Sequence, residues 1–488
     1  MQDIIILIPG ILGSTLQKDG RDLYPPLRNG DTTRGFVWDL LRRKPLHSLM
    51  LDGDDYRLNS LEDGITANRL VHEDDIVIPG FNFRILREFT YTRLSDYLID
   101  ELELKKGDIN NQQPANYFEF PYDWRRDNRA IASQLEALVN EKLNLWRSAE
   151  AKNAKAILIA HSMGGLIARQ YIEVLGGWQN CRALITFGTP YRGSVKALDY
   201  LGHDSKVSRL FAPTREVIRS LTSVYQLLPI YKSVKIHEGY QPLSEIDNLP
   251  KTIDKVRVLD ALKFHRDIES AQKHNAKDDL YGKEFQTIPF VGTESKTHQS
   301  ANWLGEGLMG SYELPAEISK ERGGGDGTVP RVSATPIEFD TTPGLRSRTR
   351  YVIAPHATIQ SHTSVMRDIV EFIRDLELPS EKPVRGDLGE AGIILELDDV
   401  YLKDESVTIR AEIKGNLSIE LFNGLLMKAV VRNVEGHSEP RTVLFEKREE
   451  DWYLSIDDLE PGLYRVEVSA QRDSGILKPV RELFAVIL

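Results

Sequence analysis

The sequence predicts an α/β domain, in which helices cover a mostly parallel sheet, followed by a smaller all-β domain. Up to about residue 375, short aliphatic and β-branched runs alternate with segments of helical periodicity. From residue 392 onward, strand-like runs follow one another with no helical pattern between them, as in an immunoglobulin-like β-sandwich. The polar, proline-containing stretch 378–383 is typical of a linker. We therefore expect two domains, at 1–378 and 388–488.

The overall composition is that of an ordinary globular protein. Of the 488 residues, 41% are hydrophobic and 28% are charged, which excludes collagen-like and disordered chains. The 62 Lys and Arg residues against 73 Asp and Glu residues give a net charge of −11. This sign opposes binding of nucleic acid, or of an anionic membrane over the whole surface.

Cysteine usage and the short apolar segments indicate a reducing compartment. The single Cys181 cannot form an intramolecular disulfide, and no zinc-ligand spacing of Cys and His occurs. The apolar run 4–8 follows Asp3 and is too short for a signal peptide, and no segment approaches the ~20 apolar residues that span a bilayer. We expect a cytoplasmic protein without a metal or another cofactor, with peripheral membrane contact as the alternative.

Six short apolar runs are candidates for the strands of the parallel sheet. Between them, Ile131, Leu135 and Leu138 recur at helical spacing, so residues 128–148 should lay one helical face on the sheet. A second helix is expected over residues 166–175, where the glycines that follow suit a C-terminal cap. The expected strands are 4–8, 117–121, 156–160, 183–187, 285–291 and 350–354.

Two segments interrupt this alternation and are candidates for a cap or lid, residues 18–85 and 194–280. The second contains a dense apolar stripe from Val217 to Ile230. Such a stripe is typical of a helix packed on its own domain, and a lid that faces lipid is the alternative.

The strongest local motif surrounds Ser162. The strand 156–160 runs directly into His161-Ser162-Met163-Gly164-Gly165 and then into a helix, which is the context of a nucleophile elbow. Ala160 and Gly164 are small, as the tight turn requires, because larger side chains would collide with the neighbouring strand and helix. A serine that only caps the helix is the alternative, and the strand–turn–helix context favours a nucleophile.

A serine hydroxyl needs a base within hydrogen-bond reach and a third group that orients the base. In this architecture the acid precedes the histidine along the chain, and Asp326 in the glycine-rich loop 323–330 is the candidate acid. One alternative is a solvated aspartate on a flexible loop. Another is a phosphate-binding loop, but the Lys-Ser/Thr pair that such a loop needs does not follow the glycines here.

Two histidines compete for the role of base, because both follow the strand 350–354. His356 lies two residues past the strand, where a loop can bring its ring over the end of the sheet, and we favour it. His362 lies at the start of the next helix, where its alternative role is to cap that helix. His161 adjoins the serine, but the turn points adjacent side chains apart, so we expect it to serve in packing.

Ester chemistry also needs hydrogen-bond donors for the developing oxyanion. One should be the backbone amide of Met163, which follows the serine. The other should come from the loop after the first strand, where the amide of Ile11 lies between two glycines that let the main chain turn.

These motifs together resemble the lecithin:cholesterol acyltransferase family, which includes phospholipases A and phospholipid:diacylglycerol acyltransferases on an α/β-hydrolase fold. The resemblance covers about residues 3–375, and the C-terminal sandwich lies outside it. We expect this protein to differ from the members that have a secretory signal and a lid disulfide or a membrane anchor, so their lipoprotein or membrane-bound settings are not carried over. It implies Ser162, Asp326 and a histidine after the last strand as a triad, and Trp124, Leu227 and Leu228 as candidates beside the acyl site. The motifs that carry it are 8–14, 121–125, 161–165, 187–190, 227–229 and 325–330.

The sequence thus predicts a serine-dependent lipid acyl ester hydrolase of the lipase or phospholipase kind, working through an acyl-enzyme on Ser162. One alternative is an acyltransferase that moves a phospholipid acyl chain to an alcohol. Another is a catalytically silent lipid-binding scaffold, against which the intact serine, acid and histidine argue. The expected substrate is a lipid or another acyl ester, and the lid is expected to contact a membrane surface transiently. Nucleic acid is not an expected partner, and the sequence does not identify a partner of the sandwich.

Overall fold

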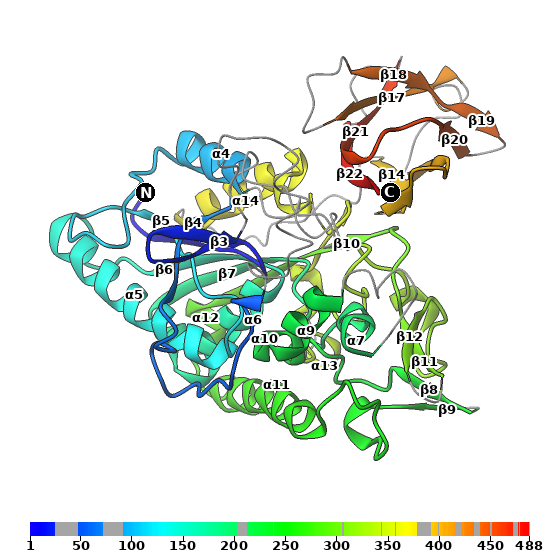
Figure 1. The fold of residues 1–488 in the computed structure, drawn as a ribbon. Coiled ribbons are helices and arrows are strands. Elements are labelled where there is room, and N and C mark those ends of the chain that lie inside the picture. Colours follow the sequence, from blue (N-terminus) through cyan, green and yellow to red (C-terminus); the bar gives the residue numbers. More distant parts are fainter. Residues whose placement is uncertain are drawn as a thin grey trace.

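The protein consists of an α/β body and a β-rich C-terminal unit (Figure 1). Their arrangement is taken from a computed structural model, which describes residues 1–24, 47–71, 91–202, 212–237, 239–304, 307–342, 344–356, 358–377, 392–398, 400–414, 422, 424–433, 440–448, 451–471, 477 and 479–487.

A six-stranded parallel sheet lies at the centre of the body, with the strand order β13-β10-β7-β6-β1-β5. All six predicted strands are present. The middle strands are buried along their whole length, as in β1, where every residue of Ile-Ile-Ile-Leu-Ile is buried, because helices cover both faces of the sheet. The strands are β1 (Ile4–Ile8), β5 (Tyr117–Glu119), β6 (Ala156–His161), β7 (Cys181–Phe187), β10 (Gln286–Thr293) and β13 (Arg350–Ile353).

Helices form a layer on each side of the sheet. In Figure 1, α4 (Thr92–Leu102) and α14 (Thr363–Glu377) lie above it, whereas α5 (Asn128–Ala149), α6 (Met163–Arg169) and α11 (Lys255–Asn275) lie below it. The Asp127 side chain caps α5 by accepting a hydrogen bond from the Arg129 amide. The predicted helix 166–175 is α6 continued by the π-helical segment η2 (Gln170–Val174), after which Gly176 has a φ of +75°.

The second predicted cap segment is helical and carries part of a small sheet. The apolar stripe lies on α9 (Ala212–Ser220), α10 (Thr222–Tyr225) and the turn that follows, and Val217, Leu221 and Leu228 belong to the main hydrophobic core. In the described residues the stripe therefore packs on its own domain, and a lid that faces lipid stays the untested alternative. The small sheet has the order β12-β11-β8-β9, with β8 (Val234–Ile236), β9 (Gly239–Gln241), β11 (Ser300–Trp303) and β12 (Leu308–Ser311).

The first predicted cap segment lies partly outside the described residues. Its described part is a three-stranded antiparallel sheet of β2 (Ser14–Lys18), β3 (Arg21–Tyr24) and β4 (Ile65–Leu70), which continues from the loop after β1. The remaining short elements of the body are α7 (Val195–Gly202), α12 (Tyr281–Glu284), α13 (Glu338–Thr341), η3 (Gly177–Gln179), η4 (Leu243–Glu245), η5 (Lys320–Arg322), η6 (Arg346–Arg348) and η7 (Ile359–Ser361).

The C-terminal unit consists of two sheets, with the orders β14-β16-β20-β19 and β15-β22-β21-β17-β18. They share a hydrophobic cluster that includes Trp452, Val466 and Phe484 and is separate from the main core, as the predicted sandwich requires. Its strands are β14 (Gly392–Glu396), β15 (Val400–Leu402), β16 (Val407–Lys414), β17 (Leu426–Asn433), β18 (Arg441–Leu444), β19 (Glu446–Arg448), β20 (Asp451–Ile456), β21 (Gly462–Gln471) and β22 (Val480–Ile487).

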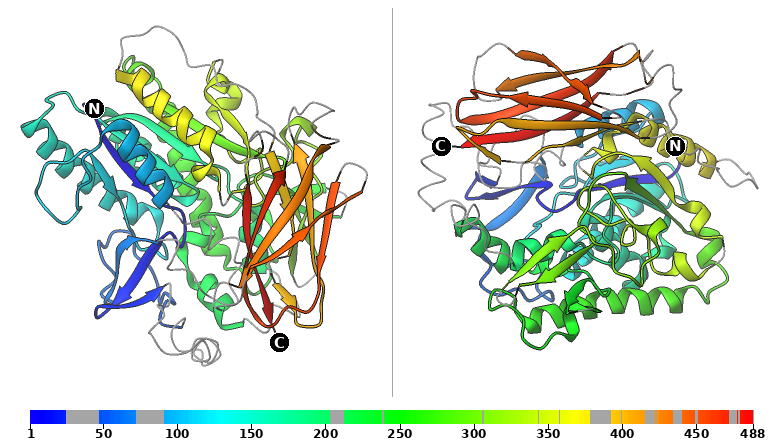
Figure 2. Two further views of the ribbon diagram at one scale, coloured as in Figure 1. Left: turned by 90° about the horizontal axis from the view of Figure 1, so that it is seen from above. Right: turned by 90° about the vertical axis from the view of Figure 1, so that its right-hand side faces the viewer.

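The sandwich stands beside the body as a layered unit of its own, seen as the orange and red strands in both views of Figure 2. It contacts the body where strand β13 ends, because Gly392 lies against Ile353. The Lys296 ammonium and the Glu396 carboxylate form an ion pair across this contact at 2.6 Å. Among the helices that the structure describes, none has the length and hydropathy of a bilayer-spanning segment.

Candidate active site

Ser162 occupies a sharp turn between β6 and α6. Its φ of +50° and ψ of −122° are rare for a residue with a side chain, and its amide is held by the Phe187 carbonyl of β7 at 2.9 Å. A Cβ on Gly164 would overlap the Pro9 carbonyl oxygen, so only glycine lets the loop after β1 approach this closely. The strand–turn–helix context that predicted a nucleophile elbow is therefore present.

The structure brings Ser162, His356 and Asp326 into one line of hydrogen bonds. Nε2 of His356 lies 3.0 Å from Oγ of Ser162, and Nδ1 of His356 lies 2.7 Å from Oδ2 of Asp326. All three side chains are buried. A Cβ on Gly188 would lie 2.7 Å from both the Asp326 carboxylate and Nδ1 of His356, so the glycine leaves room for this pair.

The other carboxylate oxygen of Asp326, Oδ1, accepts hydrogen bonds from the main chain. Oδ1 accepts the amide hydrogens of Thr328 at 3.0 Å and of Val329 at 2.7 Å, while Oδ2 faces His356. The Asp326 carbonyl in turn accepts the amide hydrogen of His356 at 2.7 Å. The loop that carries Asp326 and the residue His356 thus hold each other in place.

The other candidate base, His362, lies elsewhere. It ends the turn η7 and begins α14, and its Nδ1 lies 2.8 Å from Oγ of Ser364. This is the helix-capping position that the sequence offered as its alternative role. The imidazole beside Ser162 is that of His356.

The loop after β1 lies against Ser162, as the prediction of an oxyanion site requires. A Cβ on Gly10 would be 3.1 Å from the Cβ of Ser162. Leu12 has a φ of +65°, which is uncommon for a residue other than glycine. Met163 begins α6, and the first amides of a helix have no acceptor within the helix. The amides of Ile11 and Met163 stay the predicted oxyanion donors.

Two aromatic residues of the 121–125 motif hold this loop through hydrogen bonds to its main-chain carbonyls. The Tyr122 hydroxyl donates to the Pro9 carbonyl at 2.9 Å, and Nε1 of Trp124 donates to the Ser14 carbonyl at 3.0 Å. Trp124 is 1% exposed and packs edge-on against Tyr24, with 5.0 Å between the ring centroids. These contacts make Trp124 a support of the loop, and its predicted place beside an acyl chain stays a prediction.

The remaining predicted residues are placed as follows. Asp123 pairs with Arg125, with 2.9 Å between Oδ1 and Nε. Leu227 packs against the cluster of Leu166, Phe264 and Ile268, and Leu228 is buried in the main core. These contacts do not test the predicted role of Leu227 and Leu228 in substrate binding.

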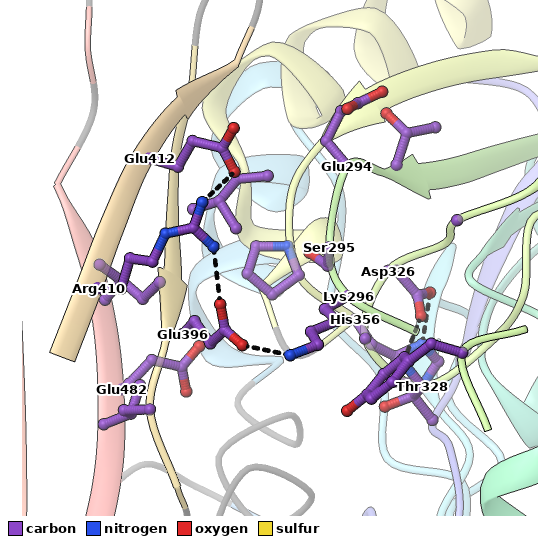
Figure 3. A pocket seen from close by; sticks show the side chains of 18 of the residues that line it. Glu294, Ser295, Lys296, Asp326, Thr328, His356, Glu396, Arg410, Glu412 and Glu482 are labelled. Carbon is purple, nitrogen blue, oxygen red and sulfur yellow. Dashed lines mark hydrogen bonds and ion pairs between the residues drawn. The ribbon is translucent and has the colours of Figure 1, made fainter. Parts of the chain in front are cut away.

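A cavity of about 590 Å³ lies between the Asp326–His356 pair and the sandwich. Figure 3 shows Glu396 at its centre, where the carboxylate pairs with Lys296 at 2.6 Å and with Arg410 at 2.9 Å. The lining is thus strongly charged on the sandwich side. Within the described residues, no three His, Cys, Asp or Glu side chains gather in a way that could hold a metal ion.

Sequence reasoning missed one residue of the site and part of another's role. Tyr91, which precedes α4, is 1% exposed, and its hydroxyl lies 2.8 Å from Nδ1 of His161. Nε2 of His161 lies 3.2 Å from the His356 carbonyl oxygen. His161 therefore packs, as predicted, and also bonds to the active-site loop; no sequence motif marks Tyr91.

The chain shows one family match and several weak structural likenesses. The family model described as lecithin:cholesterol acyltransferase matches residues 80–283, a span that contains Ser162 and ends before Asp326 and His356. No curated protein sequence gives a match.

Among solved structures, a lipase from Bacillus licheniformis, BlEst2 in its propeptide form, is 10% identical with a TM-score of 0.30 and covers 99% of this chain and 93% of its own. Its mature form is 12% identical with a TM-score of 0.29, over 77% of this chain and 92% of its own. A superoxide reductase (neelaredoxin) from Ignicoccus hospitalis is 13% identical with a TM-score of 0.16, over 20% of this chain and 80% of its own. TM-scores this low say nothing about activity.

The family match agrees with the ordered motifs of the sequence and with the six-stranded parallel sheet behind Ser162. It implies an enzyme of the acyltransferase or lipase type with a lipid substrate. Over residues 80–283, less than half of the chain, the sequence is similar to the lecithin:cholesterol acyltransferase family.

Proposed function

We propose that the protein is a serine-dependent lipid acyl ester hydrolase of the lipase or phospholipase kind. The observation that carries the proposal is the line of hydrogen bonds from Oγ of Ser162 through the His356 imidazole to Oδ2 of Asp326, with lengths of 3.0 and 2.7 Å. A hydroxyl, an imidazole and a carboxylate in this order are the parts that nucleophilic acyl transfer needs.

In the proposed mechanism each group has its own step. His356 accepts the Ser162 hydroxyl proton at Nε2 while Oγ attacks the ester carbonyl carbon. The amides of Ile11 and Met163 stabilise the developing oxyanion, at about 3 to 4 kcal/mol for each donor by mutational precedent. His356 then passes the proton to the departing alcohol, which leaves an acyl chain on Ser162. Water, deprotonated by His356, then attacks the acyl carbon, and His356 returns that proton to Oγ of Ser162 as the fatty acid leaves.

Asp326 holds His356 in the tautomer that can act as a base, and replacement of Asp326 by asparagine tests this role. The Thr328 and Val329 amides require an oxygen at the Oδ1 position, so the new NH2 group must face Nδ1 of His356. The imidazole proton then moves to Nε2, where the base is needed. We expect kcat to fall about 10⁴-fold with a nearly unchanged melting temperature.

Asp254→Asn is the matched control for this substitution. Asp254 caps α11, and its Oδ1 also accepts two main-chain amides, those of Val256 at 2.8 Å and Arg257 at 3.3 Å, but it contacts no histidine. Because asparagine caps helices as well as aspartate does, this variant should keep full activity. An Asp326→Asn enzyme with undiminished kcat would contradict the assigned role.

Acyl transfer to an alcohol is the second candidate function, and the family match favours considering it. Both reactions share the acyl-enzyme on Ser162 and differ in what attacks it. Transfer requires an acceptor alcohol held near His356 at high effective concentration, with water kept out. The cavity that adjoins His356 is lined by Lys296, Glu396 and Arg410 and does not include Ser162, so it does not mark an apolar acceptor site beside the acyl-enzyme. We therefore favour hydrolysis.

A partition assay separates the candidate functions. The purified enzyme is given phospholipid vesicles with and without a long-chain alcohol or lysophospholipid, and free fatty acid and new ester are both measured. We expect free fatty acid to dominate in both cases. New ester that dominates at acceptor levels far below that of water would identify an acyltransferase. Neither product from folded enzyme would favour the silent lipid-binding scaffold.

A further inference from the structure

Three elements that meet at Ser162 are connected behind it by one buried chain of hydrogen bonds. The amide of Gly10, in the loop after β1, donates to the Tyr91 hydroxyl at 2.8 Å. The same hydroxyl lies 2.8 Å from Nδ1 of His161, which ends β6 and precedes the serine. Nε2 of His161 lies 3.2 Å from the carbonyl oxygen of His356.

The two ends of this chain determine the direction of every bond in it. The Gly10 amide can only donate, so the Tyr91 oxygen accepts there and keeps its own proton for Nδ1 of His161. A carbonyl oxygen can only accept, so the proton of neutral His161 must be on Nε2 to reach His356. The two requirements agree, and one tautomer of His161 satisfies both.

The surroundings keep His161 uncharged while His356 takes up and releases protons. His161 and Tyr91 are 0% and 1% exposed. Burial, and after it the neighbouring His356, hold the pKa of His161 well below its usual range, and its hydrogen bond to the His356 carbonyl opposes this shift. The two imidazole rings lie 4.9 Å apart between centroids. His161 therefore does not compete with His356 as a base.

We propose that Tyr91 and His161 form a positioning pair, which holds the amide-bearing loop after β1 and the main chain of His356 at a fixed separation on either side of Ser162. The inference rests on the proposed function of Ser162. Neither side chain touches the reacting atoms, so the pair acts through the groups that it holds.

Both groups held by the pair act on the same ester carbonyl. Gly10 is the neighbour of Ile11, whose amide is a predicted oxyanion donor, and His356 moves the proton. A misplacement of about 1 Å at such a site can cost on the order of 100-fold in rate. The loop is also held at Pro9 and Ser14 by Tyr122 and Trp124. Loss of the Tyr91 hydroxyl should therefore misplace the Gly10 amide without unfolding the loop.

Tyr91→Phe tests the pair, because it removes one hydroxyl and keeps the ring. With a short soluble ester, we expect kcat to fall about 10- to 100-fold while KM stays within about twofold, since ground-state binding does not use the pair. Tyr401→Phe is the matched control. The Tyr401 hydroxyl in the sandwich is likewise buried, accepts the Asp398 amide at 2.9 Å and donates to the Thr408 carbonyl at 2.9 Å. This variant should lose comparable stability and keep its kcat.

A second set of variants serves if Tyr91→Phe does not fold. His161→Gln keeps a donor for the His356 carbonyl and should retain clearly more kcat than His161→Leu, which keeps only bulk. In a folded Tyr91→Phe background, His161→Leu should cost little further, because residues that act as a unit are not additive.

The inference is overturned if Tyr91→Phe keeps a kcat like that of Tyr401→Phe, or if His161→Gln and His161→Leu are equally active. Either result, with a wild-type enzyme whose turnover depends on Ser162, leaves the proposed function intact. A wild-type enzyme without turnover would instead count against the proposed function itself.

Discussion

Replacement of Ser162 by alanine should abolish ester turnover and labelling by a fluorophosphonate, a probe that reacts with a serine whose hydroxyl is activated. The wild-type protein should carry one adduct, on Ser162. Loss of the nucleophile of a triad costs on the order of 10⁶-fold in kcat, because what remains comes from the oxyanion donors and binding alone. Adduct mapping by mass spectrometry and the release of fatty acid measure the two effects.

The same substitution should leave the melting temperature nearly unchanged. Alanine keeps the Cβ and the strained main chain of Ser162, and the hydroxyl makes its hydrogen bond to His356 for the reaction rather than for packing. Ser133→Ala, at an exposed position on α5, is the control that should keep both labelling and turnover. An adduct on another serine, or turnover that survives in Ser162→Ala, would refute the assignment.

Much of the fold could be predicted because buried parallel strands are continuous aliphatic runs. β1 and β6 are buried at every position, and such runs stand out between polar segments. The sandwich was predicted from alternation, which β17 shows as a regular exchange of buried and less buried positions.

The small sheet of β8, β9, β11 and β12 could not be predicted in the same way. Ala301 pairs with Val234, so strands of only three or four residues meet across a long stretch of chain. The identity of their partners depends on tertiary packing, which local pattern does not contain. The π-helical turn η2 inside the second helix is also invisible to periodicity over so few residues.

The candidate site was predictable as far as its residues follow strands in a known order. Ser162 directly follows β6, and His356 lies just past β13, whereas Asp326 is reached only by a loop rich in glycine. Tyr91 could not be found from the sequence, because its hydroxyl acts on His161, 70 residues away, and aromatic residues before a helix are common. The apolar stripe with Leu228 fits lipid or core equally well in sequence, and its packing in the core is seen only in the structure.

Removal of the His356 imidazole should cost about as much activity as removal of the Ser162 hydroxyl. In His356→Ala the serine proton has no acceptor at 3.0 Å, and the buried Asp326 carboxylate loses its partner at 2.7 Å. Because the serine proton has no acceptor, we expect kcat to fall on the order of 10⁶-fold. The loss at Asp326 predicts a lower melting temperature, because a buried carboxylate that loses a hydrogen-bond donor is costly. The kcat must therefore be measured well below the new transition.

His362→Ala is the control that separates a base from a helix cap. Its imidazole contacts the Ser364 hydroxyl at 2.8 Å at the start of α14, so its loss should lower stability slightly and turnover modestly. Adding Ser162→Ala to His356→Ala should cost little further, because nucleophile and base act on one step as a unit. The reverse ranking of the two histidines, or a double variant whose losses multiply, would mean that the hydrogen bond between Ser162 and His356 is not the one that activates the serine.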